Sequence, residues 1–160
     1  AAHRTGEPPA PTQGVTNELL KLIPLFREGR GRLLIVATNF IRALDAAFLR
    51  HGRFDYVIPI GLPDEDARRS IWTRYIPTQT LDTVDLDRLV ERTAGFSPAD
   101  IEYAARKGSQ RALEAAVYQD GSQSGPSTED YDWAIGQTRM TVSKDVAEDF
   151  LVDIDELARL

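Results

Sequence analysis

The sequence has no cysteine and only two histidines, His3 and His51. A chain without thiols forms no disulfide and offers no thiolate ligand, and two histidines alone are too few for a zinc site, so we expect no structural metal. The longest apolar run, residues 33–37, is far shorter than the about 20 residues that cross a bilayer. The first residues also lack the charged start and apolar stretch of a signal peptide. We therefore expect a cytoplasmic protein without a membrane span.

The sequence also lacks an excess of positive charge and a glycine-rich P-loop with its lysine. A net charge of -6 argues against a protein that wraps nucleic acid, and aromatic and basic side chains do not interleave as they do in nucleic-acid-binding surfaces. With 160 residues, 42% of them hydrophobic, we expect one or two compact units. Acidic residues gather after Ser143, either as a solvated helix face or as a partner site.

Among the features that are present, residues 33–37 (Leu-Leu-Ile-Val-Ala) are continuously apolar and partly β-branched. This pattern predicts a strand buried on both faces, as in a parallel sheet. Asn39 follows just beyond its carboxyl end, where open α/β sheets bind their ligands. Its amide could hold a water or a phosphate oxygen, or the residue could simply begin a turn.

Two arginines lie three residues apart in the segment L-D-A-A-F-L-R-H-G-R-F-D, residues 44–55. Paired guanidinium groups such as those of Arg50 and Arg53 match the geometry of phosphate oxygens. The alternative for Arg53 is a bracing ion pair with Asp45 or Asp55. Residues 56–60 predict a further strand, and their proline indicates an edge or terminal position.

The rest of the chain predicts helices. Asp64, Asp85, Ser97 and Ser143 are each placed to cap one, and Asp100 completes an approximate capping box with Ser97. A further helix is expected from residue 128 or 129. Gly108 predicts a close approach between helices. The last helix has an apolar stripe, which either packs on the other helices or recruits a partner; it consists of Val146, Phe150, Ile154 and Leu157.

Four segments, in order, resemble the second half of the nucleotide-binding module of AAA ATPases. They are A-T-N at residues 37–39, the segment at 44–55, L-P-D at 62–64 and G-F-S-P-A-D-I at 95–101. The resemblance implies an α/β part followed by an all-α part: the last strands of a P-loop NTPase parallel sheet, then a four-helix-type AAA lid. The expected divisions are a linker or surface loop at 1–14, the α/β part at 15–63, and the lid with a C-terminal helix at 64–160.

The resemblance also implies roles in ATP hydrolysis. Asn39 matches sensor 1, which orients the attacking water. Arg50 matches the arginine finger, which reaches the nucleotide of the neighbouring subunit, and Arg53 matches the second arginine of that motif. A finger supplied in trans changes turnover by about 10³ to 10⁵.

In the lid, the resemblance implies contacts to the nucleotide base and ribose. Ile71 and Tyr75, four residues apart on one helix face, match positions that contact adenine, although an ordinary packing pair would look the same. Gly95, Pro98 and Ala99 match the start of the helix that covers the base and ribose.

The Walker A and Walker B motifs of the family are absent from the sequence, and both would precede residue 15. We therefore expect this chain alone to bind no ATP tightly and to be inactive, with ATP and Mg bound in an intact parent ATPase. By resemblance the parent is a homo-oligomeric ring, a hexamer, that remodels or unfolds a protein substrate. The alternative is a nucleotide-independent oligomerisation or adaptor module derived from an AAA domain.

Overall fold

The computed structural model describes residues 11–39, 41–43, 47–50, 52–118 and 125–159. It divides into two compact units: a first unit of Ala1–Ile58 with Leu157–Leu160, and a helical unit of Pro59–Glu156. This division falls five residues before the predicted one at 63/64. None of the helices in the described ranges combines the length and the hydropathy that a membrane span requires.

The first unit contains one long helix, α1, at Pro11–Arg27, and a short 3₁₀ turn, η1, at Ile41–Ala43. α1 begins inside the predicted linker, of which residues 1–10 lie outside the described part, and Pro24 lies within the helix rather than ending it. Among the described residues of the first unit, the buried apolar side chains are Ile23 and Phe48.

The predicted strands do not form in the described part of the chain. Residues 33–37 form no strand and have no ladder partner, and the side chains of Leu33 and Ile35 are each 80% exposed. Residues 56–60 contribute only a single bridge, between Val57 and Arg159. A central parallel strand is stable only between hydrogen-bonded neighbours, and the described residues supply none. An apolar β-branched pattern alone therefore does not make a sheet.

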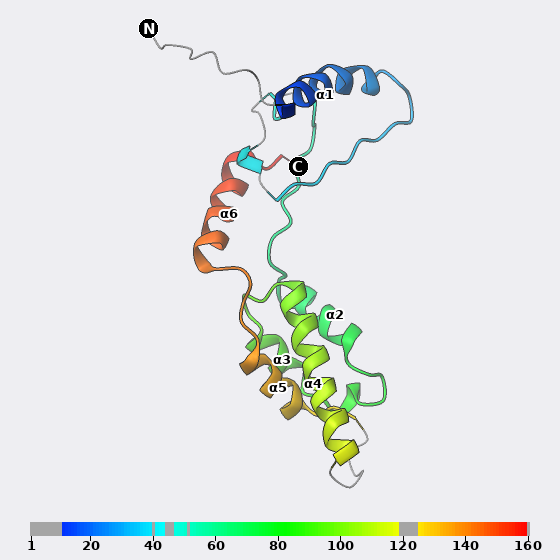
Figure 1. Cartoon of the computed structure of the whole chain (residues 1–160), viewed down its shortest axis with the longest axis vertical. Helices are drawn as coiled ribbons and strands as arrows, with labels where there is room; N and C mark the ends of the chain where they lie inside the picture. The colour runs from blue at the N-terminus through cyan, green and yellow to red at the C-terminus, as the bar shows by residue number, and fades with distance from the viewer. Residues whose placement is uncertain (1–10, 40, 44–46, 51, 119–124, 160) are drawn as a thin grey trace. The chain divides into compact units, whose positions relative to one another are not determined.

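The helical unit is built from α2 (Glu65–Tyr75), α3 (Leu86–Arg92), α4 (Pro98–Tyr118) and α5 (Thr128–Gln137), with a 3₁₀ turn, η2, at Leu81–Thr83 (Figure 1). α4 packs against α2 and α5, and α3 contacts both α2 and α5. These helices share one core, whose most buried side chains are Trp72, Leu89, Val90, Ile101, Ala104, Ala105 and Tyr131. The predicted helical lid is thus confirmed.

Side-chain caps begin these helices where the sequence predicts them. The Asp64 carboxylate accepts a 2.8 Å hydrogen bond from the Ala67 N–H at the start of α2. Asp85 accepts one from the Arg88 N–H, at 3.0 Å, at the start of α3. Such a cap satisfies one of the four N–H groups that a helix leaves unpaired at its first turn.

Gly108 of α4 lies in close contact with Asp130 and Tyr131 of α5. A Cβ at this position would lie 2.5 Å from Cδ1 of Tyr131 and 3.1 Å from its Cα. The Tyr131 ring in turn meets the Trp72 indole edge-on, with centroids 5.5 Å apart. The predicted close approach at Gly108 is therefore confirmed, and it allows the two largest core side chains to meet.

The last helix, α6 at Lys144–Leu157, contains no buried residue. Ser143 caps it, because the Ser143 hydroxyl accepts a 3.3 Å hydrogen bond from the Val146 N–H. Phe150 lies against Gly61, where an added Cβ would be 2.6 Å from its ring, but Val146 is 57% exposed. The apolar stripe of α6 is thus not packed into the core of the helical unit.

Candidate functional site

The N-terminus of α4 is held by a local network of hydrogen bonds around Ser97 and Asp100. The chain leaves α3 through Gly95, whose φ of +83° is a left-handed conformation that favours glycine. Ser97 and Asp100 then form a reciprocal cap: the Asp100 carboxylate accepts from the Ser97 N–H at 2.9 Å, and the Ser97 hydroxyl is 3.2 Å from the Asp100 N–H. Pro98 and Ala99, in the first helical turn, remain exposed.

Asp100 also joins this cap to the segment that precedes α6. Its Oδ2 accepts hydrogen bonds from the Thr141 hydroxyl at 3.1 Å and the Thr141 N–H at 3.3 Å. Burial acts to raise the pKa of Asp100, but the hydrogen bonds from Ser97 and Thr141 outweigh it and place the pKa below its ordinary value of 3.8. The buried carboxylate is therefore ionised at neutral pH.

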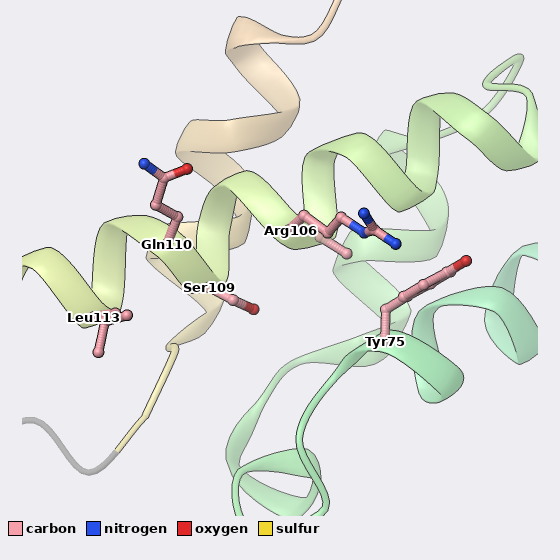
Figure 2. Close-up of a pocket in the computed structure, with 6 residues that line it drawn as sticks. Tyr75, Arg106, Ser109, Gln110 and Leu113 are labelled. Atoms are coloured by element: carbon pink, nitrogen blue, oxygen red, sulfur yellow. The ribbon is translucent and has the colours of Figure 1, made fainter.

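A shallow pocket of about 320 Å³ opens between α2 and α4. Figure 2 shows the Tyr75 side chain rising from α2 beside the Arg106 guanidinium of α4. Arg106 forms a 2.6 Å ion pair with Glu102, and a hydrogen bond between Tyr75 and that same carboxylate raises the pKa of the phenol. Ser109 and Leu113 are among the remaining lining residues.

The pocket does not gather the residues predicted to contact the nucleotide base. Tyr75 lines it, whereas Gly95, Pro98 and Ala99 do not. Ile71 is partly buried against the core, as expected of a packing residue. Their contact to a nucleotide stays a prediction.

The two arginines of the first unit have different surroundings. The Arg53 guanidinium donates a short hydrogen bond to the Ala47 carbonyl and is half-buried. It does not pair with Asp55, whose carboxylate lies 2.9 Å from the Arg27 guanidinium; Asp45 lies outside the described residues. Arg53 thus stabilises its own turn through a hydrogen bond to a backbone carbonyl rather than through an ion pair with Asp55.

Arg50 and Asn39 are both exposed. Within the described ranges the Arg50 guanidinium has no hydrogen-bond or ion-pair partner. The turn that follows passes through Gly52, whose φ of +86° is again left-handed. Arg50 is therefore available to an external anion, and Arg53 is less so.

The sequence reasoning missed a buried charge in the helical unit. Asp132 on α5 is 7% exposed and pairs with Arg88 and, at 2.8 Å, with Arg92, both on α3. Since each arginine side chain is about half exposed, the ion pairs join α3 to α5 without burying all of the positive charge. The sequence signal that could have revealed it is the position of Asp132 between two aromatic residues in an amphipathic helix.

No family model matches the chain, but individual proteins do. It is 45% identical over 87 residues to the ATP-dependent zinc metalloprotease FtsH of Staphylococcus haemolyticus, covering 54% of this chain and 12% of that protein. It is 38% identical over 101 residues to the ATP-dependent zinc metalloprotease YME1L of Drosophila melanogaster, covering 63% of this chain and 13% of that protein. It is also 41% identical over 94 residues to the cell division cycle protein 48 homolog of Archaeoglobus fulgidus, covering 56% of this chain and 13% of that protein.

Solved structures show the same fold. The crystal structure of the FIGL-1 AAA domain matches with a TM-score of 0.72 at 21% identity, over 93% of this chain and 52% of that one. The same domain in complex with ADP matches with a TM-score of 0.63 at 23% identity, over 78% of this chain and 44% of that one.

The fold is therefore that of part of an AAA domain. Over about half of its length or slightly more, the chain is similar to AAA ATPases of the FtsH, YME1L and Cdc48 types, which confirms the resemblance drawn from the four sequence segments. The chain spans only about an eighth of the length of these curated relatives.

Proposed function

We propose that this chain is the C-terminal portion of an AAA ATPase and that it completes the nucleotide site of a neighbouring subunit through Arg50. The observation that supports this role is the contrast between the two arginines. Arg53 is committed to the Ala47 carbonyl, whereas the Arg50 guanidinium is exposed and has no partner among the described residues. An arginine that acts in trans must remain free of intramolecular partners until the neighbour arrives.

Arg50 suits this role because negative charge spreads over the transferring phosphoryl oxygens during hydrolysis. A guanidinium presented at that moment stabilises the transition state more than the ground state. Asn39 is exposed just after the apolar segment 33–37 and would orient the attacking water with its amide. In this proposal Arg53 keeps the turn in shape and thereby positions Arg50.

The remaining phosphate and metal contacts come from outside this chain's residues. The sequence has no P-loop, and within the described ranges no three carboxylate or histidine side chains converge to hold a cation. ATP and Mg are therefore bound by the P-loop part of an intact ATPase. The lid contributes the exposed first turn of α4, with Pro98 and Ala99 facing the base and ribose, and Tyr75 contacting the base from α2.

For the whole protein we propose a cytoplasmic homo-oligomeric ring that uses ATP hydrolysis to remodel or unfold protein substrates. The similarity to FtsH, YME1L and Cdc48-type proteins supports this proposal. Each ring interface would then contain one nucleotide, the P-loop of one subunit and Arg50 of the next.

A rescue assay tests the role of Arg50. The chain is mixed with an AAA subunit that has an intact P-loop but alanine at the position matching Arg50, and ATP hydrolysis is measured. We expect the wild-type chain to restore hydrolysis, Arg50→Ala to restore none, and Arg74→Ala, which removes another exposed arginine, to behave as wild type. Equal rescue by Arg50→Ala would refute the finger role.

The absence of a P-loop keeps one alternative open: an adaptor module that uses the same surfaces only for assembly. Gel filtration of the mixture with and without ATP separates the two. Association that requires ATP supports the shared nucleotide site. Association that is equally strong without nucleotide, together with no rescue, supports the adaptor.

A further inference from the structure

An exposed cationic and aromatic patch lies on α4 and α5. Trp133 of α5 is 42% exposed, yet two cations cover its ring: Lys107 Nζ lies 5.4 Å from the ring centroid, and the Arg111 guanidinium carbon lies 4.8 Å from it. Lys107 also lies 5.5 Å from the centroid of Tyr103, which is 54% exposed. We call Tyr103, Lys107, Arg111 and Trp133 the tryptophan patch.

The tryptophan patch is positively charged within an acidic unit. Residues 59–156 hold ten Lys and Arg against twenty Asp and Glu. Arg111 is partly neutralised by Asp130, at 3.4 Å, but among the described residues Lys107 has no carboxylate partner. Exposed aromatic rings held in place by cations are pre-organised for contact, because little side-chain entropy remains to be lost on binding. The chemistry that fits them is an acidic surface with exposed apolar side chains.

Helix α6 has this chemistry. Asp145, Glu148, Asp149 and Val152 follow one another at helical spacing and so share one face. The three acidic side chains are exposed, and Val152 is 48% exposed. Next to this face Leu151 is 64% exposed.

We propose that α6 of one copy of this chain docks on the tryptophan patch of a second copy. Lys107 and Arg111 are one helical turn apart on α4, and Asp145 and Asp149 are one turn apart on α6. Both spacings correspond to a rise of about 6 Å, so the two ion pairs form in a single register, while Val152 and Leu151 cover the aromatic rings.

The occupant is a second copy because α6 forms no packed helix pair with α4 or α5 of its own chain. A contact between α6 of one subunit and α4–α5 of another either closes reciprocally as a two-fold dimer or, when it is head-to-tail, repeats into a ring or a filament. It needs no nucleotide, and it is therefore independent of the role proposed for Arg50.

A charge-swap experiment on the full-length chain without nucleotide tests this proposal. Sedimentation equilibrium of the wild-type chain should show concentration-dependent self-association, weakened by salt because the contact is ionic. We expect Lys107→Glu to weaken association at least about tenfold. Arg74→Glu, a charge reversal at an exposed site of the same unit, should leave it nearly unchanged.

The decisive arm mixes two variants. Lys107→Glu and the double variant Asp145→Lys with Asp149→Lys should each be largely monomeric. Their equimolar mixture should associate again, because the unchanged α6 of the first variant can dock on the unchanged tryptophan patch of the second. Circular dichroism verifies that each variant keeps its helices, and the recovered association shows that both are folded.

Three outcomes would overturn the proposal. The wild-type chain remains monomeric up to about 100 μM, a weak specific affinity. Alternatively, Lys107→Glu associates as well as Arg74→Glu. Finally, the mixture stays monomeric, as it would if α6 docked on the patch of its own chain. None of these results bears on rescue of ATP hydrolysis through Arg50, so the two proposals can fail separately.

Discussion

Replacing Gly108 by alanine should destabilise the helical unit, although alanine is the better helix former. In an open helix position the substitution stabilises by about 1 kcal/mol. Here the new methyl group would lie 2.5 Å from Tyr131 Cδ1 and 3.2 Å from the Asp130 carbonyl oxygen. Tyr131 is fully buried and cannot swing away, because the Trp72 ring packs against it.

The expected magnitude follows from these two opposing effects. Overpacking a core by one methyl group costs about 1–3 kcal/mol, which exceeds the gain in helix propensity. We expect Gly108→Ala to lower the free energy of unfolding by about 1 kcal/mol. Gly136→Ala on α5 is the matched control, because nothing lies within 4 Å of its added Cβ, and it should raise the free energy of unfolding by up to about 1 kcal/mol.

Urea unfolding followed by far-ultraviolet circular dichroism measures both variants on the same scale. The reasoning is refuted if Gly108→Ala is as stabilising as Gly136→Ala, because the α4–α5 contact would then have room for a methyl group. It is also refuted if the two variants differ by less than the error of the extrapolation.

Three further predictions concern the helical unit. Asp100→Asn should lower stability at pH 7 by about 1–2 kcal/mol through loss of the cap. The folded pKa of Asp100 is below 3.8, so the loss of stability should be complete above about pH 5. It should disappear as the pH falls through the folded pKa, because the side chain at position 100 is then uncharged in both proteins. A loss of stability that stays constant in urea titrations at different pH values would contradict this. Asp132→Ala should lower the free energy of unfolding by less than the double variant Arg88→Ala with Arg92→Ala, for which we expect a loss of about 3–5 kcal/mol. The reason is that only the double variant leaves a buried charge unpaired. The opposite order in urea unfolding would contradict this. Trp72→Ala should cost about 3–5 kcal/mol in the same assay, and a loss below 1 kcal/mol would show that its burial matters little.

Local signals predicted the helical unit well because its helices are specified by nearby residues. Asp64 and Asp85 are short acceptors placed just before an amphipathic segment, and each caps the helix that follows. Gly108 predicted a close approach because a glycine within an alanine-rich helix lowers helix stability and is therefore expected where a neighbouring helix leaves no room for a side chain. The two caps depend only on neighbouring residues, whereas the partner of Gly108, Tyr131, lies on another helix and was not identified from the sequence.

The sheet was predicted less well because strands depend on distant partners. Residues 33–37 have the composition of a buried strand, but nothing in their own sequence supplies the neighbours that would pair with them. The same holds for Asp132, whose partners on α3 are forty or more residues away. The roles of Asn39 and Arg50 depend on a further partner, a nucleotide and its P-loop, and they rest on motif spacing and exposure.

The most direct test of the shared nucleotide site is the single-turnover rate of ATP hydrolysis in an assembly that contains this chain. The chain, or its Arg50→Ala variant, is combined with P-loop subunits that lack their own finger, and the rate is compared at equal incorporation and saturating ATP. If Arg50 completes the neighbour's site, the variant should be slower by about 10³-fold or more, with nucleotide affinity little changed. Equal rates for both assemblies would contradict the account.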